Sequence, residues 1–145
     1  MHKTAVIDAS VIIKWFISKK EQGRKEARLL YRLLIDEQIS LFAPQFLLVE
    51  ILNILIKRHH VPRVKVKKFL SKLIHCGIHF EGMMSDDFDH LATIMTQHAI
   101  SSYDGLYMLL SEKKKAPLIT EDRQLLEIKD ISMNCKEFLT ALTST

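Results

Sequence analysis

The sequence predicts an α/β fold, a three-layer α/β/α sandwich around a central, mainly parallel sheet of four to five strands. Short β-branched runs alternate with longer segments of helical periodicity along the chain. This alternation favours parallel strands, because two parallel strands need a crossover connection between them. Linkers, repeats and low-complexity segments are lacking from the sequence, so we expect residues 1–145 to form a single domain.

The individual elements follow from local patterns and end signals. The expected strands are residues 3–7, 40–43, 78–80, 117–120 and, as a fifth candidate, 131–135. The expected helices are residues 11–16, 21–36, 45–58, 62–75, 85–98 and 103–114, a short helix after Asp122, and 137–142. Ser10, Ser85 and either Ser101 or Ser102 are the expected N-caps, because a hydroxyl oxygen can accept a free N–H of a first turn.

Composition places the chain among ordinary globular proteins. Hydrophobic residues make up 48% and charged residues 26% of the sequence. Cys76 and Cys135 lie far apart without metal-binding spacing, which predicts buried thiols in a reducing compartment. An export signal and an apolar run of about 18 residues are both missing, so we expect a cytoplasmic protein without a membrane span. The net charge of +4 favours a polyanionic partner only weakly.

Four acidic residues stand at unusual places in this pattern. Asp8 and Asp122 each follow a predicted strand, where open parallel sheets collect their ligands. Glu50 interrupts the apolar helix FLLVEILNILI, and Asn53, three residues later, shares its face. Asp104 lies in the first turn of the helix ISSYDGLYMLL. Two of the four acids are thus expected at one edge of the sheet.

Each acid also has an ordinary explanation. Asp104 and Asp122 suit the positive end of a helix dipole, Asp8 suits a helix N-cap, and Glu50 suits a buried salt bridge. These explanations treat the residues singly. Four carboxylates in one site would repel strongly, since two unit charges 4 Å apart interact by about 4 kcal/mol even at an effective dielectric of 20. Such a site needs a divalent cation or raised pKa values, and oxygen ligands suit Mg²⁺ or Mn²⁺ better than Zn²⁺.

The motifs around the acids resemble those of PIN-domain ribonucleases, close to the VapC-like toxins of bacterial and archaeal toxin–antitoxin pairs. The resemblance runs from end to end and rests on VIDAS (Asp8, Ser10), EILNIL (Glu50, Asn53), ISSYDGLYMLL (Asp104) and LITEDRQL (Thr120, Asp122). Gly105 stands where the family usually has Ala, which could loosen the helix start. Glu121 precedes the last acid as either a spare ligand or an exposed residue.

The resemblance implies metal-dependent hydrolysis of RNA phosphodiester bonds by an endoribonuclease. Asp8, Glu50, Asp104 and Asp122 would hold Mg²⁺ or Mn²⁺ as the catalytic set. By the same resemblance, the residues that orient their carboxylates are Ser10, Asn53 and Thr120. A small antitoxin that lays a peptide across the site, and homodimerisation, are the partners that the family leads us to expect.

Two basic segments and two other function classes stay open at this stage. The segment KRHHVPRVKVKK, residues 57–68, and the lysines of residues 113–115 could contact RNA or form solvated helix faces. A receiver-like phospho-acceptor domain would use Asp8, but the second N-terminal acid that it needs is missing from the sequence. A PIN-like interaction module without catalysis would keep the sheet and bind no metal.

Overall fold

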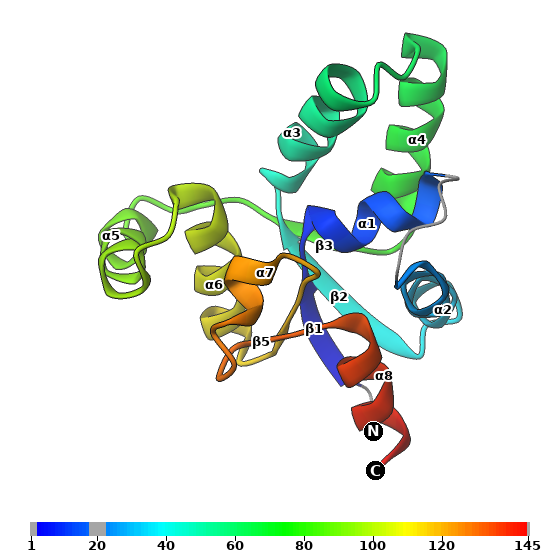
Figure 1. Ribbon diagram of the computed structural model, residues 1–145. Helices are drawn as coiled ribbons and strands as arrows, with labels where there is room; N and C mark the ends of the chain where they lie inside the picture. The colour runs from blue at the N-terminus through cyan, green and yellow to red at the C-terminus, as the bar shows by residue number, and fades with distance from the viewer. Residues whose placement is uncertain (1–2, 18–22, 145) are drawn as a thin grey trace.

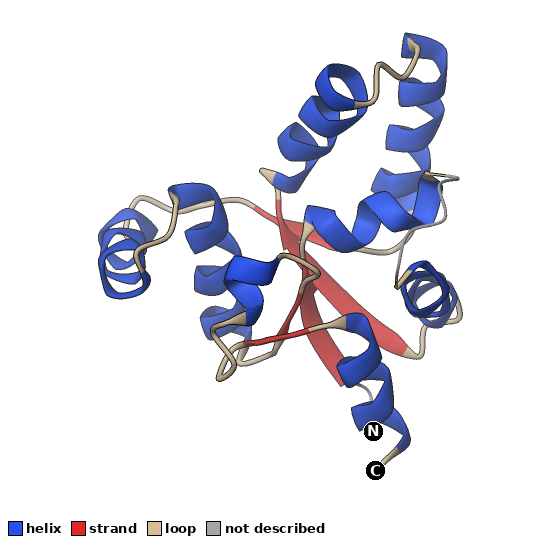
Figure 2. Ribbon diagram, viewed as in Figure 1, coloured by secondary structure: helices blue, strands red, loops and turns tan. Residues whose placement is uncertain are grey.

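The computed structural model describes residues 3–17 and 23–144, in which a sheet is covered by helices on both faces (Figures 1 and 2). The strands are β1 (Lys3–Ile7), β2 (Ile39–Pro44), β3 (His79–Glu81), β4 (Leu118–Ile119) and β5 (Ser132–Met133). The helices are α1 (Ala9–Phe16), α2 (Arg24–Ile35), α3 (Leu47–Leu52), η1 (Asn53–Arg58), α4 (Arg63–His75), α5 (Asp87–His98), α6 (Ser102–Lys114), α7 (Arg123–Leu126) and α8 (Cys135–Thr143).

The sheet has the order β3-β2-β1-β4-β5, and all neighbouring strands are parallel. The predicted α/β class with a parallel sheet is therefore confirmed. The chain order reverses at β1, which pairs with β2 on one side and with β4 on the other. In open parallel sheets such a reversal opens a crevice at the carboxyl ends of the strands. The site is therefore expected where β1 and β4 end.

The helices form two layers and a projecting arm. Helix α6 packs on β1, β2 and β4 and carries α5 outside it, whereas α2 packs against α1, β2 and α8 (Figure 1). Helices α3, η1 and α4 extend beyond the carboxyl end of β2 (Figure 1). No helix of the described residues combines the length and apolar character that a membrane span needs.

The second half of the central strand, β1, lies in the hydrophobic core and is apolar throughout. Ala5, Val6 and Ile7 are fully buried, because helices cover both faces of β1. Cys76 and Cys135 are both free and buried, as predicted from their spacing. The apolar residues of β1 therefore end directly at Asp8, which begins the site.

Three expectations about the helices were wrong, two about their N-caps and one about the type of helix. Asp8, not Ser10, is the N-cap of α1, since its carboxylate accepts the N–H of Ser10. Helix α5 begins at Asp87 after Asp86, so Ser85 is not its cap. Residues 45–58 form a short α-helix followed by the π-helix η1, not one regular helix. Ser101 does cap α6, and the expected start of the second helix at Glu21 lies outside the described residues.

Candidate functional site

A hollow of about 490 Å³ opens at the carboxyl ends of β1 and β4. All four predicted acids line it, although they come from four separate segments of the chain. Its lining residues are Asp8, Ala9, Ser10, Ile13, Lys14, Glu50, Ile54, Arg58, His59, Asp104, Tyr107, Glu121 and Asp122. We call this the acid hollow.

Asp8 is the most deeply placed acid, with 5% of its surface exposed. Its Oδ1 accepts hydrogen bonds from the N–H and the hydroxyl of Ser10, and its Oδ2 accepts one of 2.6 Å from Thr120 Oγ1. The same hydroxyls accept backbone N–H groups, that of Glu121 at Ser10 and that of Asp122 at Thr120. Ser10 and Thr120 thus connect the end of β1 to the segment after β4.

Burial dominates the charge state of Asp8. Loss of hydration raises its pKa from 3.8 to about 6, while the hydrogen bonds from Ser10 and Thr120 counter that rise. The nearby charge of Asp122 raises the pKa further. The Asp8 carboxyl is therefore harder to ionise than an aspartic acid in water.

Glu50 projects from α3 toward the same hollow and is held by a residue that the sequence analysis did not single out. The hydroxyl of Tyr107 donates a hydrogen bond of 2.8 Å to Glu50 Oε1. Burial raises the pKa of Glu50 to about 7, with the charges of Asp8 and Asp104 adding to the rise. Asn53, the predicted partner, is exposed at the start of η1 and lies outside the set of described residues that line the hollow.

Asp104 and Asp122 occupy helix starts at the outer side of the hollow. Asp104 lies in the first turn of α6, and its own N–H donates to the capping hydroxyl of Ser101. Burial, followed by the charge of Asp122, raises the pKa of Asp104. Asp122 is the N-cap of α7, because its Oδ1 accepts the N–H groups of Gln124 and Leu125. Both acids therefore lie at the N-terminal end of a helix and line the acid hollow.

The donor atoms of the acid hollow suit a hard divalent cation in chemistry but are not grouped around one point. Among the described residues, no three Asp, Glu, His or Cys side chains are arranged to hold a metal ion as they stand. Three of the acids instead accept hydrogen bonds: from hydroxyl groups at Asp8 and Glu50, and from backbone N–H groups at Asp122. Oxygen-only donors with mutual charge repulsion are nevertheless the set that Mg²⁺ or Mn²⁺ prefers.

The π-helix η1 brings positive charge to this acidic site. Glu50, Ile54, Arg58 and His59 all line the hollow, and the N–H of His59 bonds to the carbonyl of Ile54 at 3.1 Å, five residues back. A turn of this width advances the helix face more slowly than an α-turn, so both residues at the end of η1 stay on the side of Glu50. In an uninterrupted α-helix Arg58, eight residues after Glu50, would also lie near its face, whereas His59, nine residues after it, would point away.

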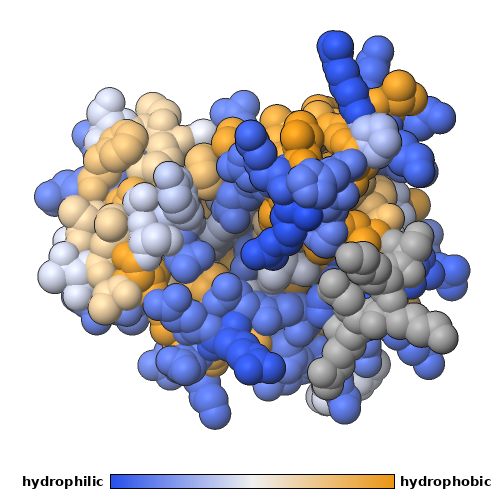
Figure 3. All heavy atoms as spheres, turned by 45° about the horizontal axis from the view of Figure 1, so that its top comes forward, coloured by the Kyte–Doolittle hydropathy of each residue, from blue (hydrophilic) through white to orange (hydrophobic). Residues whose placement is uncertain are grey.

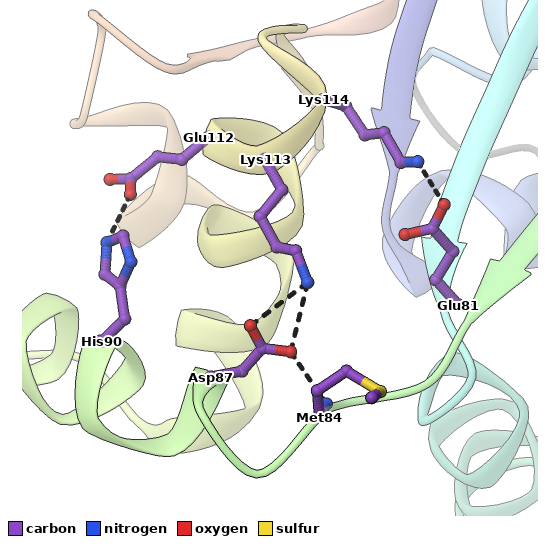
Figure 4. Close-up of polar contacts among 7 residues, drawn as sticks. All are labelled: Glu81, Met84, Asp87, His90, Glu112, Lys113 and Lys114. Carbon is purple, nitrogen blue, oxygen red and sulfur yellow. Dashed lines mark hydrogen bonds and ion pairs between the residues drawn. The ribbon is translucent and has the colours of Figure 1, made fainter.

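The structure separates the two basic segments that the sequence treats alike. Lys113 pairs with Asp87 at 3.2 Å, and Lys114 pairs with Glu81 (Figure 4). Lys114 Nζ also lies 4.4 Å from the ring centroid of Phe42. These lysines are therefore matched by acids of β3 and α5. The segment 57–68 instead contributes Arg58 and His59 to the acid hollow.

A second depression of about 760 Å³ continues from the acid hollow along η1 and α4. We call it the basic groove; its lining residues are Phe16, Ile17, Leu55, Arg58, His59, His60, Val61, Lys65, Lys68, Phe69 and Lys72. Its apolar residues come from α1, η1, α4 and the residues directly beside them, and the described residues of the lining include four Arg and Lys cations and no acid. Figure 3 shows apolar and strongly hydrophilic side chains close together on the part of this face where α3 and α4 lie.

Residues 5–131 match the PIN domain family. The chain belongs to this family. Membership supports a nuclease function, as the sequence predicts. No significant sequence match was found among curated proteins.

Solved structures with this PIN fold include proteins from an archaeon and two bacteria. PAE2754 from Pyrobaculum aerophilum aligns with a TM-score of 0.68 at 19% identity, covering 99% of this chain and 97% of that protein. VapC20 from Mycobacterium tuberculosis, described as a Sarcin-Ricin loop cleaving toxin, aligns with a TM-score of 0.64 at 15% identity over 82% and 90%. VapBC2 from Rickettsia felis, bound to a DNA fragment from its promoter, aligns with a TM-score of 0.60 at 15% identity over 90% and 98%.

The two departures from the family pattern have local structural roles. A Cβ atom on Gly105 would lie 2.7 Å from Leu91 Cδ1, so glycine at this position permits the close contact of α5 with α6. The start of α6 stays capped by Ser101. The carboxylate of Glu121 accepts the N–H of Cys135 at the start of α8 and also lines the acid hollow.

Proposed function

We propose that this PIN-domain protein is a metal-dependent endoribonuclease, the toxin of a toxin–antitoxin pair. One observation carries the proposal: Asp8, Glu50, Asp104 and Asp122 come from four chain segments and line one hollow where the strand order reverses. Family membership supports the nuclease function, and the similarity to a toxin described as cleaving the Sarcin-Ricin loop supports RNA as the substrate.

The proposed mechanism assigns a role to each group that faces the hollow. Mg²⁺ or Mn²⁺ held by the four acids would supply an activated water and neutralise charge on the phosphoryl oxygens. Ser10 and Thr120 hold the Asp8 carboxylate from both sides, and Tyr107 holds Glu50. Arg58 lines the same hollow, where its guanidinium can bind a phosphate oxygen of the substrate.

The arrangement around Asp8 also bears on the phospho-acceptor alternative. A phospho-acceptor must present a free carboxylate oxygen to its donor. Both oxygens of Asp8 instead accept hydrogen bonds, and only 5% of the residue is exposed. These contacts favour a positioned ligand over an accessible nucleophile.

Cleavage of single-stranded RNA with and without Mn²⁺ tests the enzyme proposal. We expect Asp8→Asn and Asp104→Asn each to lower the cleavage rate by at least about 100-fold, because each removes one negative ligand. Asp89→Asn is the matched control: Asp89 is an exposed first-turn acid of α5, outside the acid hollow. Equal rates in all four proteins, or cleavage that does not depend on metal, would contradict the proposal.

Calorimetric titration with Mn²⁺ tests the metal site without relying on activity. The wild-type protein should bind Mn²⁺ with measurable heat, and Asp8→Asn should bind it far more weakly, because the ion loses a charged ligand. If the wild type gives no more heat than the Asn variant, the non-catalytic interaction module becomes the better explanation of the fold.

We further propose an antitoxin whose acidic amphipathic segment occupies the basic groove. The similarity to the VapBC2 structure supports such a partner, and the groove supplies matching chemistry, with apolar side chains beside Lys65, Lys68 and Lys72. A small protein encoded next to this one should bind in calorimetry, and Lys68→Glu should weaken that binding at least about tenfold. Lys129→Glu, outside the groove, serves as the control. Equal loss in both variants would contradict this placement.

We also propose that the protein works in the cytoplasm as a homodimer. Tyr103, 55% exposed, stacks on Phe46 with ring centroids 4.8 Å apart, and Val49 on the same helix as Glu50 is 48% exposed. Apolar surface of this kind favours a protein interface. Light scattering should give twice the monomer mass, and Tyr103→Glu should reduce it toward the monomer. A monomeric wild type would contradict the dimer.

A further inference from the structure

We propose that one RNA strand crosses the acid hollow between two cationic flanks: Arg58 on one side, and Arg123 and Lys136 on the other, bind the phosphates that adjoin the scissile one. The inference rests on the proposed nuclease function and adds the course of the substrate. The second flank belongs to a depression of about 440 Å³, here called the side hollow, which lies against α1, α7 and α8.

The three depressions adjoin one another through shared residues. Arg58 and His59 line both the basic groove and the acid hollow, whereas Lys14 and Glu121 line both the acid hollow and the side hollow. In Figure 1, α1 lies between η1 and α4 on one side and α7 and α8 on the other. A strand that passes over the acids can therefore meet cations both before and after them.

RNA can approach the acid hollow only if positive charge nearby offsets the repulsion from its carboxylates. The acid hollow holds five carboxylates when Glu121 is included, and they repel an approaching polyanion. Arg58 and Lys14 are the lysine and arginine residues among its described lining, so further positive charge has to come from its neighbours. Phosphate contacts by Arg and Lys fix the register of a nucleic acid and contribute most of its non-specific affinity.

The side hollow provides this charge immediately beside the catalytic acids. Arg123 follows Asp122 as the first residue of α7, and Lys136 lies in the first turn of α8. Two acids, Glu26 and Glu121, also line the side hollow, and Glu121 is engaged with the N–H of Cys135. With Lys14, the described residues that line the side hollow include three cations and two acids.

The lining of the side hollow favours a nucleic-acid backbone over a peptide. Leu126 is the one large apolar side chain among the described residues that line it, whereas the basic groove has five. A docked peptide gains most of its affinity by burying apolar side chains. A phosphate chain needs hydrogen-bond donors and positive charge, and an Arg guanidinium can bind phosphate with two parallel N–H groups.

The proposed course of the RNA strand over the acid hollow, between Arg58 and the Arg123/Lys136 flank, is called the path below. Salt-dependent RNA binding tests it. Affinity for a 12-nucleotide single strand is measured in EDTA, with Asp8→Asn as the parent to prevent cleavage. Arg123→Ala combined with Lys136→Ala should reduce the slope of log affinity against log salt by about 1.4, the value expected for two lost phosphate contacts. The control double variant, Arg32→Ala with Lys129→Ala, removes the same charges from residues outside the three depressions.

Variants of two neighbouring residues, Arg58 and Lys57, test the flank on the side of the basic groove. Arg58→Ala should reduce the slope by about 0.7, whereas Lys57→Ala should leave it unchanged, because Lys57 belongs to η1 but not to either described lining. The path is overturned if each variant matches its control or if the parent binds no RNA. It is also overturned if the Arg123/Lys136 variant keeps its RNA affinity but loses affinity for an acidic peptide such as a glutamate 12-mer.

The path and the nuclease proposal can fail separately. If the slopes change as expected but the wild type cleaves no RNA with Mn²⁺, the path stands as a binding surface and the nuclease proposal fails. If cleavage depends on Asp8 and on metal but the slopes do not change, the nuclease stands and the path fails.

Discussion

The four acids of the hollow all stand at or near helix starts, but they fall into an inner and an outer pair by their contacts with side-chain hydroxyl groups. The inner pair, Asp8 and Glu50, accepts hydrogen bonds from the hydroxyl groups of three side chains, Ser10, Thr120 and Tyr107. The outer pair, Asp104 and Asp122, lies at the N-terminal ends of α6 and α7. Asp8 is itself the N-cap of α1 and Glu50 lies in the first turn of α3, so the hydroxyl contacts are what distinguish the inner pair.

The two pairs differ in how much burial disfavours the ionised form of their carboxyl groups. Burial raises the pKa of Asp8 to about 6 and that of Glu50 to about 7, because the surroundings of the inner pair exclude water. Asp104 of the outer pair is half-buried and its pKa is also raised, whereas the N-cap position of Asp122 places its charge at the positive end of α7. A cation bound by all four would therefore relieve the inner pair most.

Loss of the inner hydroxyl support should have the largest effect on stability. Thr120→Val leaves the buried Asp8 Oδ2 without a donor and the N–H of Asp122 without an acceptor, so we expect the free energy of unfolding to fall by about 3 kcal/mol. Ser101→Ala removes the hydroxyl that caps α6 beside the outer Asp104 and should cost only about 1 kcal/mol. Urea unfolding measures both.

Thr96→Val controls for the change of shape in the first experiment. The hydroxyl of Thr96 bonds to a backbone carbonyl on the exposed side of α5, so its removal should change the unfolding free energy by less than about 0.5 kcal/mol. If Thr120→Val costs no more than Ser101→Ala, the inner hydroxyl does not carry the support that the geometry suggests.

Neutralising the inner pair should stabilise the metal-free protein at high pH. The pKa of Glu50 is raised from 4.5 to about 7, so the folded state binds the extra proton between these values and the free energy of unfolding falls as pH rises through that window. Glu50→Gln removes this loss and should gain about 2 kcal/mol above pH 7, and nothing below pH 4.5. Unfolding in EDTA across this pH range measures it.

Two comparisons sharpen that result. Asp104→Asn should give a smaller gain, because Asp104 is only half-buried in the outer pair. Glu127→Gln, at an exposed position outside the acid hollow, should give none. A gain for Glu50→Gln that is the same at pH 4 and pH 8 would show that burial of its charge is not the cause.

The smallest effects on stability are expected at Asp122. Asparagine caps a helix as well as aspartate, so Asp122→Asn should change the free energy of unfolding by less than about 0.5 kcal/mol, whereas Asp122→Ala should cost about 1 kcal/mol. Both variants remove the charge, so both should weaken Mn²⁺ binding in calorimetry, and Asp122→Ala at least as much as Asp122→Asn because it also removes the oxygen ligand. Normal Mn²⁺ binding by Asp122→Asn would show that the charge of Asp122 caps α7 but does not contribute to metal binding.

The sequence by itself determined the architecture and the neighbourhood of the site. Alternating strands and helices predict a parallel sheet, because crossover connections are needed between its strands, and the structure has five such strands. The ends of β1 and β4 place Asp8 and Asp122 at one edge of the sheet, since parallel strands end on the same side. These conclusions need only local periodicity and the rules of chain connection.

Tertiary structure alone decided which groups support and surround the acids. Tyr107 bonds to Glu50 across 57 residues of sequence, a contact that no motif indicated, whereas the bond of Thr120 to Asp8 across 112 residues is one that the family resemblance implied and the fold brings about. The wide turn of η1 keeps His59 on the side of the acids, while Asp87 and Glu81 pair with the lysines of α6. Local periodicity carries no information on such contacts, because they depend on how the packed helices bring distant side chains together.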